Sequence, residues 1–317
     1  MLCFSYCLRS GGLKMAYIVR AADSIVYELL LSFLLYKRRA NLKYLDKGTE
    51  WIQEVDEKLT SEFKKEIDTF EELAFGDVAC VFIEQCQENH QINTFLEWLK
   101  SLSATQMYES LAPHLRERDS TILLELEKQR DLFVYFISEW NVQYFQSQAN
   151  LHHLKKASEA VTQAINDKIS PAVIVENFAS GLQIEMKEIK YVHLIPSIHF
   201  SPLHTFSILK ENLFVWFPIQ VDRSNLKDIV NMGKCLSDRK RLEILQFLST
   251  GAFTFTDVLK QIGGAKGNIH HHIMTLRAGG LVRIHIADGG QTFLASTRKS
   301  FIPEIKEKLN VFLFNQH

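Results

Sequence analysis

The sequence predicts a mainly α-helical protein: an N-terminal helical domain closed by a short β segment, and a C-terminal winged helix-turn-helix domain. Three observations predict this fold class. Glycine and proline are rare between Leu13 and Ser180, and stretches without these breakers favour helices. A stretch rich in β-branched and aromatic residues begins at Ile189. From about Ser224 the patterns follow the order helix, short helix, glycine turn, helix and hairpin.

The composition is that of a globular protein. The chain has 317 residues, which is enough for two domains that each bury a core. The longest apolar stretch, Ile25–Tyr36, is too short to span a bilayer and contains Glu28, so we expect no membrane contact. The five cysteines are scattered and form no CxxC pair. They predict no disulfide framework and fit a reducing cytoplasm, where we expect the protein to act.

The predicted domain boundaries follow changes in residue composition and in charge along the chain. Residues 1–14 lack the features of a secretory signal, and we expect a disordered tail there, with Met15 as the working start. Residues 15–221 form a helical sensor or coupling domain, and residues 222–317 a winged helix domain for DNA binding and dimerisation. Residues 222–300 carry 12 Lys and Arg against 6 Asp and Glu, whereas residues 1–221 carry 22 against 29. This asymmetry suggests a polyanion partner for the basic segment, although chance clustering on a solvated face gives the same charge.

Apolar residues at helical spacing predict the helices of the N-terminal domain. Trp51, Val55, Leu59 and Phe63 recur at every fourth position, as expected for the buried side of a helix. Such stripes most simply pack a helical core. Further helical patterns cover Ser24–Lys37, Ile92–Leu102, Ala104–Leu111, Thr121–Phe145 and Leu151–Ile165.

The stretch from Ile189 to Val221 predicts two or three short strands joined by turns, which close the first domain. His193 and His199 would share one face of a strand, with His204 across the turn. Three such histidines could bind a metal, but no Cys or acidic residue stands at ligand spacing. We therefore favour exposed or hydrogen-bonded histidines and expect no metal and no cofactor.

The second domain begins with two predicted helices. The first covers Leu226–Leu236. Ser237 or Asp238 caps the next helix, whose buried side would carry Leu242, Leu245 and Leu248.

A capping box then opens the helix-turn-helix pattern. Thr254 and Asp257 have the spacing of that box, and Gly263-Gly264 supplies a tight turn. A third helix runs from Lys266 to Ala278 and stops at Gly279-Gly280. The segments LVRIHI and QTFLAS, joined by ADGG, predict a hairpin.

Three consecutive histidines, His270 to His272, lie on the third helix. Neighbouring helical residues point about 100° apart, so these rings cannot converge on one metal ion. No nucleophile or carboxylate stands at a matching offset for catalysis. Ile269, Ile273 and Leu276 face inward at helical spacing. The outward residues suit a DNA groove, although an ordinary solvated helix has a similar pattern. The expected DNA contacts are Lys266, Asn268, His270, His271, Met274 and Arg277 on the helix, and Arg283 and Gln291 in the hairpin.

The stretch LSDRKRLEILQFLSTGAFTFTDVLKQIGGAKGNIHHHIMTLRAGGLVRI closely resembles the DNA-binding domain of ArsR/SmtB-type bacterial transcriptional regulators. The resemblance implies a homodimer that places two recognition helices in successive major grooves of an imperfect palindrome. Metal-sensing members carry a Cys-x-Cys pair where this chain has Thr254 and Thr256, and the final helix lacks their other ligand set, so we do not expect metal sensing. SIVYELLLSFLLY and LIPSIHFSP resemble parts of an uncharacterised helical domain found in longer ArsR-like regulators.

The sequence therefore predicts a bacterial transcription regulator, acting as a repressor on double-stranded DNA, whose N-terminal domain senses or couples an effector. The helix at Leu226–Leu236 and the final helix, with Val311, Phe312 and Phe314, would form the dimer seam. Two alternatives stay open. The N-terminal domain could be an enzyme or a small-molecule carrier with an accessory winged helix, although no catalytic constellation favours it. The winged helix could also bind another protein instead of DNA.

Overall fold

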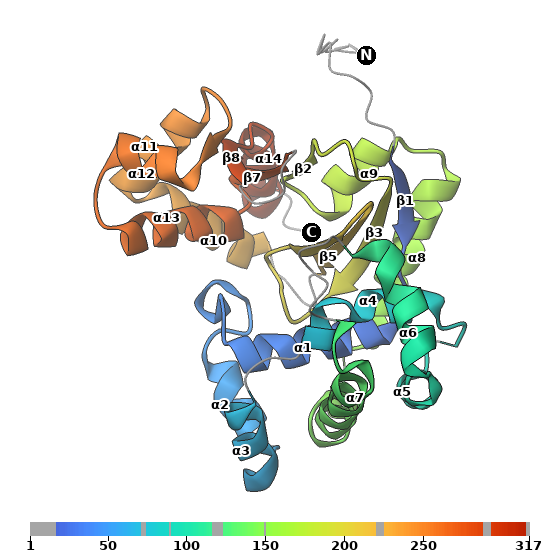
Figure 1. Ribbon diagram of the computed structural model, residues 1–317. Coiled ribbons are helices and arrows are strands. Elements are labelled where there is room, and N and C mark those ends of the chain that lie inside the picture. Colours follow the sequence, from blue (N-terminus) through green and yellow to red (C-terminus); the bar gives the residue numbers. More distant parts are fainter. Residues whose placement is uncertain are drawn as a thin grey trace.

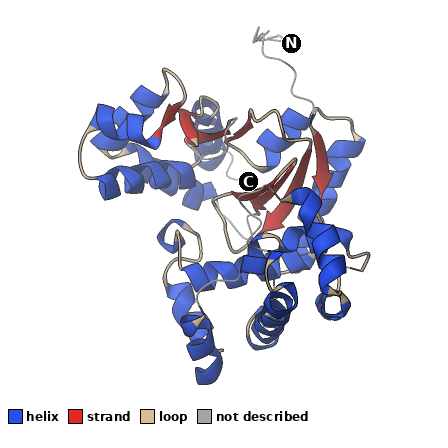
Figure 2. Cartoon of the chain, in the orientation of Figure 1, coloured by secondary structure: helices blue, strands red, loops and turns tan. Residues whose placement is uncertain are grey.

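The structure is a computed structural model, and it describes residues 17–70, 74–88, 90–115, 123–148, 150–219, 225–287 and 293–314. The predicted tail at residues 1–14 and Met15 lie outside the described residues. Helices predominate over two small sheets (Figure 2), which confirms the predicted fold class. In the part of the chain that is described, no helix is both long and apolar enough to cross a membrane.

Helix α1 (Ile25–Arg38) lies at the centre of the N-terminal helical layer. The hydroxyl of Ser24 accepts a hydrogen bond from the backbone N–H of Val26 and so caps its start. α1 packs against α7 (Leu126–Gln143), and the Trp140 indole N–H of α7 donates a hydrogen bond to the hydroxyl of Ser32 on α1. The other helices of this layer are α2 (Glu50–Asp56), α3 (Ser61–Thr69), α4 (Ala79–Gln85), α5 (Ile92–Ser101) and α6 (Ala104–Leu111).

The four-residue stripe that predicted one helix spans two helices and the turn between them, where Leu59 lies. Trp51, Val55, Leu59 and Phe63 are all buried, but α2 ends at Asp56 and α3 begins at Ser61. The hydroxyl of Thr60 accepts from the N–H of Phe63 and caps α3. The spacing of the apolar residues thus identified the buried side, while the local cap set the break.

The first sheet lies between two helical layers (Figure 1). It contains β1 (Ile18–Ala21), β3 (Tyr191–Ser197), β5 (Asn212–Pro218) and β4 (Thr205–Leu209), in that spatial order. β1, β3 and β5 run parallel, and β4 pairs antiparallel with β5. One face packs on α8 (His152–Asn166) and α9 (Pro171–Phe178), and the other on the α1 layer. The predicted strands are therefore present, but they form a central layer and not a closing segment alone.

The C-terminal part has the predicted element order. It contains α10 (Asn225–Leu236), α11 (Arg239–Leu248), β6 (Phe253–Thr254), α12 (Phe255–Ile262), α13 (Lys266–Ala278), β7 (Val282–Ile286), β8 (Leu294–Thr297) and α14 (Phe301–Phe314). The side chain of Asp238 caps α11. The prediction for Leu242 is wrong: it is 47% exposed, and Ile244 joins Leu245 and Leu248 in the core instead.

A strand of the N-terminal part completes the sheet of the C-terminal part. β2 (Leu182–Ile184) pairs in parallel with β7, so the second sheet has the order β2-β7-β8-β6. Gly181, with φ +83°, precedes β2, and a Cβ there would lie 3.1 Å from the carbonyl oxygen of Val282. This close approach of two backbones lets the two parts of the chain share one sheet.

Candidate nucleic-acid interface

Local sequence signals build the turn between α12 and α13. The hydroxyl of Thr254 accepts from the N–H of Asp257, and the Asp257 carboxylate accepts from the N–H of Thr254. This confirms the predicted capping box. α12 ends at Ile262, and Gly263 and Gly264 after it both adopt positive φ, which glycine tolerates. α13 then follows with the predicted bounds.

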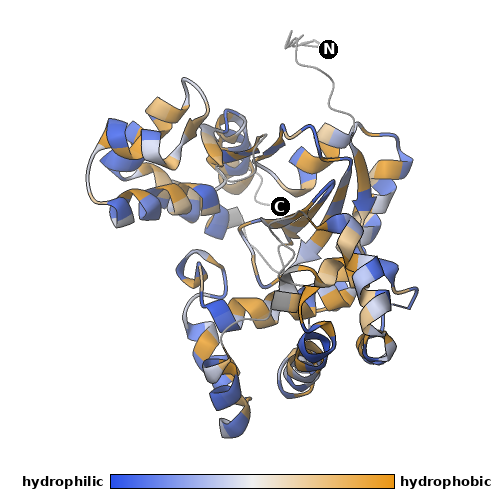
Figure 3. Ribbon diagram, viewed as in Figure 1, coloured by the Kyte–Doolittle hydropathy of each residue, from blue (hydrophilic) through white to orange (hydrophobic). Residues whose placement is uncertain are grey.

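The inward side of α13 holds it against the rest of the C-terminal core. Ile269, Ile273 and Leu276 are buried in one cluster with residues of α11 and α12, as predicted. His272 lies at the edge of this stripe, with Nδ1 3.7 Å from a carboxylate oxygen of Asp238. Figure 3 shows the resulting mixture of hydrophilic and hydrophobic residues along α13.

The first half of α13 presents its polar side to solvent. Lys266, Asn268 and His270 are exposed, and Gly267 between them has no atom near its Cβ position. Exposed cations on α11 and α12 lie in the same domain, at Arg239 and Lys260. This half of the helix therefore offers one cation, one amide and one imidazole, which are groups that can contact phosphates and base edges.

His271 is exposed but contacts the N-terminal part. Its Nδ1 lies 3.1 Å from the hydroxyl of Tyr44, and the two ring centroids are 5.7 Å apart. Tyr44 belongs to the 3₁₀ helix η1 (Leu42–Tyr44), which lies against α13. Burial lowers the pKa of His271, and the cation of Lys43 adds to this effect. Sequence reasoning missed Tyr44, because no local pattern marks a contact between residues 227 positions apart.

The second half of α13 is covered in this arrangement, which corrects two expected DNA contacts. Met274 is buried and joins the hydrophobic cluster around α1. Arg277 is only partly exposed, and burial lowers its pKa to about 10. Neither side chain stands on an open face, because the segments around η1 and His204 lie over them.

The hairpin also departs from expectation. The guanidinium of Arg283 forms an ion pair with Glu176 of α9 at 3.2 Å, so it is not free for DNA in this arrangement. His285, two residues further along β7, forms a similar contact with Glu185 at 2.9 Å. Pairing with β2 brings these carboxylates to β7. Gln291, the other expected contact in the hairpin, lies outside the described residues.

The three histidines of the β segment have separate surroundings. β3 ends at Ser197, so His193 lies on the strand while His199 and His204 follow it; the expectation of a shared strand face is wrong. His193 contacts Asn212, and His199 contacts Glu28. Among the described residues, no group of three or more His, Cys, Asp or Glu side chains is arranged to hold a metal ion.

A buried polar chain fixes the turn that faces α13. Glu28 of α1 accepts from the N–H groups of Ile198 and His199 and lies 2.7 Å from Nδ1 of His199. Nε2 of His199 lies 2.9 Å from the hydroxyl of Tyr144, which accepts from the Trp51 indole N–H. The Ser201 hydroxyl, further along the turn, donates to Asp46 of the η1 segment. The two segments that cover α13 are therefore held together.

Comparisons with known proteins bear on the C-terminal part. Residues 236–285 match a family model described as a helix-turn-helix domain. No curated protein matches the chain. One solved structure that matches is a homodimeric winged helix-turn-helix DNA-binding domain from Mycobacterium bovis, described as a possible ArsR-family transcriptional regulator. It is 21% identical, covers 31% of this chain and 95% of its own, and has a TM-score of 0.23. Residues 236–285 thus form a helix-turn-helix domain, a module that supports a role in DNA-binding regulation.

Proposed function

We propose that this protein is a sequence-specific DNA-binding transcription regulator of the ArsR-like type, acting as a repressor in the bacterial cytoplasm. The observation that carries this proposal is the exposed first half of α13 within a helix-turn-helix domain. In such domains the N-terminal residues of the second helix contact base edges, while the surrounding residues contact the backbone. Lys266, Asn268 and His270 occupy that half of α13.

Each exposed side chain has a distinct role in this proposal. Lys266, at the first position of α13, contacts a phosphate and adds affinity without reading sequence. The Asn268 amide can donate and accept at once, which suits the N6 and N7 atoms of adenine. His270 lies one turn after Lys266 on the same side of the helix, and His271 follows it; each imidazole can bond a base or a phosphate.

The dimer forms through α10 and α14. These helices pack against each other, and the Lys308 ammonium donates to Asp228 between them. No residue of α14 is buried, although the helix is rich in apolar side chains. Burying such a face against a second copy would remove it from water, which is the main driving force for association. The exposed apolar residues are Leu226, Val230, Ile302, Phe312, Leu313 and Phe314.

The N-terminal part senses or couples and does not catalyse. Its most enzyme-like group of side chains, around Glu28, His199 and Tyr144, is buried, and its members bond to one another. Among the described residues, two hollows that border α1 are lined by other side chains than these three. Their bonds instead hold the turn that meets α13. A change in the N-terminal part would therefore alter how much of α13 is free, which is a shift between two arrangements of one protein.

Selection of bound duplexes from a random pool tests the proposal. The full chain is expected to enrich an inverted repeat, because a two-fold dimer presents two copies of α13. The centres of the half-sites should lie about 10 base pairs or a multiple of this apart. Recovery of a pool with no shared motif would contradict sequence-specific binding.

A further inference from the structure

Arg277 is a largely covered cation, and the described residues offer its guanidinium no carboxylate. Among the described residues, no carboxylate lies within ion-pair distance of its guanidinium, and its Nε has no hydrogen-bond partner. Its only hydrogen-bond contact there runs from a terminal nitrogen to the sulfur of Met274, at 3.5 Å. Enclosing a charge without a counter-charge is costly, so such a group is expected to have an anionic partner.

His204 stands beside Arg277 and also lacks a partner. It is 8% exposed, and its Nε2 has no hydrogen-bond partner among the described residues. Burial, reinforced by the charge of Arg277, lowers the pKa of His204 to about 3, so the ring is neutral. A neutral imidazole with hydrogen on Nε2 can donate one hydrogen bond. Water could satisfy these N–H groups but could not neutralise the guanidinium.

Both side chains line a hollow of about 250 Å³ between the two parts of the chain. Apart from Arg277 and the neutral His204, its walls are mostly apolar. Phe206 of β4 and Phe293 beside β8 meet edge to face there, with centroids 5.1 Å apart. Apolar cavities smaller than this one can hold a benzene ring. The remaining apolar wall residues are Phe200, Leu203, Met274 and Ile284.

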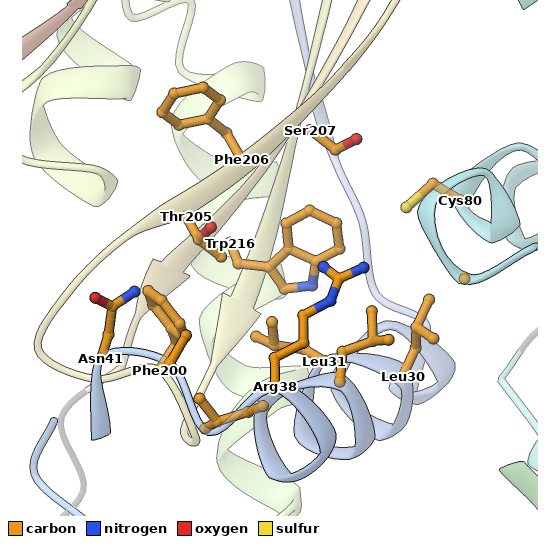
Figure 4. Close-up of a pocket in the computed structure, with 14 residues that line it drawn as sticks. Leu30, Leu31, Arg38, Asn41, Cys80, Phe200, Thr205, Phe206, Ser207 and Trp216 are labelled. Atoms are coloured by element: carbon orange, nitrogen blue, oxygen red, sulfur yellow. The ribbon is translucent and has the colours of Figure 1, made fainter. Parts of the chain in front are cut away.

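A second hollow, also of about 250 Å³, adjoins the first on the side of α1. Figure 4 shows Asn41 and Phe200 at one end of it and Cys80 at the other, with Trp216 and Arg38 between them. Asn41 and Phe200 line both hollows, as do Thr205 and Phe206. An aromatic ring bound beside Arg277 would therefore contact side chains that also line the hollow next to α1.

We propose that the hollow beside Arg277 binds a small aromatic carboxylate as an effector. The carboxylate bonds to the guanidinium of Arg277 and to Nε2 of His204, and the ring lies among Phe200, Phe206 and Phe293. His204 belongs to the N-terminal part and Arg277 to α13, so the ligand bridges them. It thereby favours the arrangement in which the second half of α13 is covered.

This inference rests on the proposed function for its regulatory consequence. The bound carboxylate holds the arrangement in which the second half of α13 is covered, whereas a bound duplex favours the arrangement in which α13 is free. Each then weakens the binding of the other by the same factor, because linkage is reciprocal. The effector would act as an inducer that releases the operator.

Calorimetric titration of the full chain without DNA tests the site. Benzoate and phenylacetate are the probes, with benzamide and phenylacetamide as neutral counterparts of the same shape. Both carboxylates should bind about tenfold to a hundredfold more tightly than the amides, as expected for charge-assisted hydrogen bonds. Equal binding of acids and amides would overturn the proposal, and so would no binding of either acid up to about 10 mM. Inorganic phosphate binding as tightly as the acids would overturn the aromatic class.

Variants separate a ligand site from a structural role. Arg277→Met should abolish carboxylate binding yet raise the melting temperature of the ligand-free chain, because it removes an uncompensated charge. The matched control is Arg283→Met, which breaks a pair with Glu176 and should lower the melting temperature but keep carboxylate binding. His204→Gln retains a donor and should bind, whereas His204→Leu should not. A lower melting temperature for Arg277→Met would assign this residue to the fold and overturn the site.

A second titration tests the coupling separately. Duplex affinity is measured with and without saturating benzoate, and it should fall in its presence. Since the first titration contains no DNA, carboxylate binding by a chain that binds no duplex would sustain the site and contradict only the proposed function. Duplex affinity unchanged by benzoate would overturn the regulatory part.

Discussion

The hydroxyl of Tyr44 lies 3.1 Å from Nδ1 of His271, and this contact joins the N-terminal part of the protein directly to the proposed recognition helix. The residues on both sides of it are held firmly. Tyr44 is itself buried, and the η1 segment is bonded through Asp46 to the turn at Ser201. The N-terminal part therefore contacts the helix that we propose reads DNA, and this contact is the physical basis of the proposed regulation.

Removing the hydroxyl in Tyr44→Phe should raise duplex affinity. The variant keeps the ring but loses a hydrogen bond worth about 0.5–1.5 kcal/mol, which favours release of α13 and corresponds to roughly a twofold to tenfold change. Fluorescence anisotropy with a labelled operator measures it. Tyr108→Phe, an exposed tyrosine on α6, is the matched control and should behave as the parent. Indistinguishable affinities for both variants would remove the contact from regulation.

Lys266→Ala should weaken binding to all duplexes alike. The loss of one phosphate contact is expected to reduce the slope of log K against log salt by about one. Lys156→Ala, an exposed lysine on α8, should leave affinity and slope unchanged. If Lys266→Ala kept the slope of the parent, this lysine would not touch the backbone.

Asn268→Ala should relax base preference more than it lowers general affinity. An amide that bonds one adenine contributes about 1–3 kcal/mol of discrimination at that position. Repeating the duplex selection with this variant measures the loss of base preference. The same selection with His271→Ala, one turn further along α13, shows which motif position each side chain affects. A recovered motif as sharp as that of the parent would place Asn268 away from the bases.

Leu313→Asp should turn the dimer into monomers. This leucine is 54% exposed on α14, and a carboxylate in its place would be desolvated by a second copy at high cost. Sedimentation velocity measures the change, with Leu124→Asp as the control because Leu124 is 68% exposed on another surface. A sedimentation coefficient that stays at the dimer value in both variants would move the seam elsewhere.

Stability should fall as the pH is lowered from about 6.5 to about 5. Burial holds the pKa of His204 in the folded protein at about 3, well below the 6.5 of a free imidazole, so the unfolded chain takes up a proton first. The unfolded state then binds more protons, and the free energy of unfolding falls by up to about 2 kcal/mol over this range. Urea unfolding at each pH measures the fall. His204→Leu should make the fall shallower, leaving the part that comes from the buried His199, whereas His90→Asn, an exposed control, should not change it. An equally steep fall in both variants would assign it to other groups.

The elements of the C-terminal domain could be predicted because their signals are local. A capping box at Thr254, a glycine pair at Gly263 and another at Gly279 lie within a few residues of the ends they define. These signals gave the bounds of α13 to the residue. The helical stripe fits Leu242 as well as Ile244, and the packing of the neighbouring helices buries Ile244 and leaves Leu242 exposed.

The arrangement between the two parts could not be predicted, because it depends on contacts between distant segments. β1 is four residues long and pairs with β3 more than 170 positions later. β2 is three residues long and pairs with β7, about 100 positions later in the chain. The burial of Met274 and the pairing of Arg283 with Glu176 follow from this arrangement. A sequence pattern shows which side of a helix is polar, but not which other segment covers it.

The salt dependence of duplex binding by the full chain is the sharpest test of whether α13 holds DNA. If the exposed half of α13 and its surrounding cations hold DNA as a dimer with six to ten phosphate contacts, log K should fall linearly with log salt, with a slope of about −5 to −9. A slope near zero, or no duplex binding at low salt, would contradict the account and leave the helix-turn-helix domain as a surface for another protein.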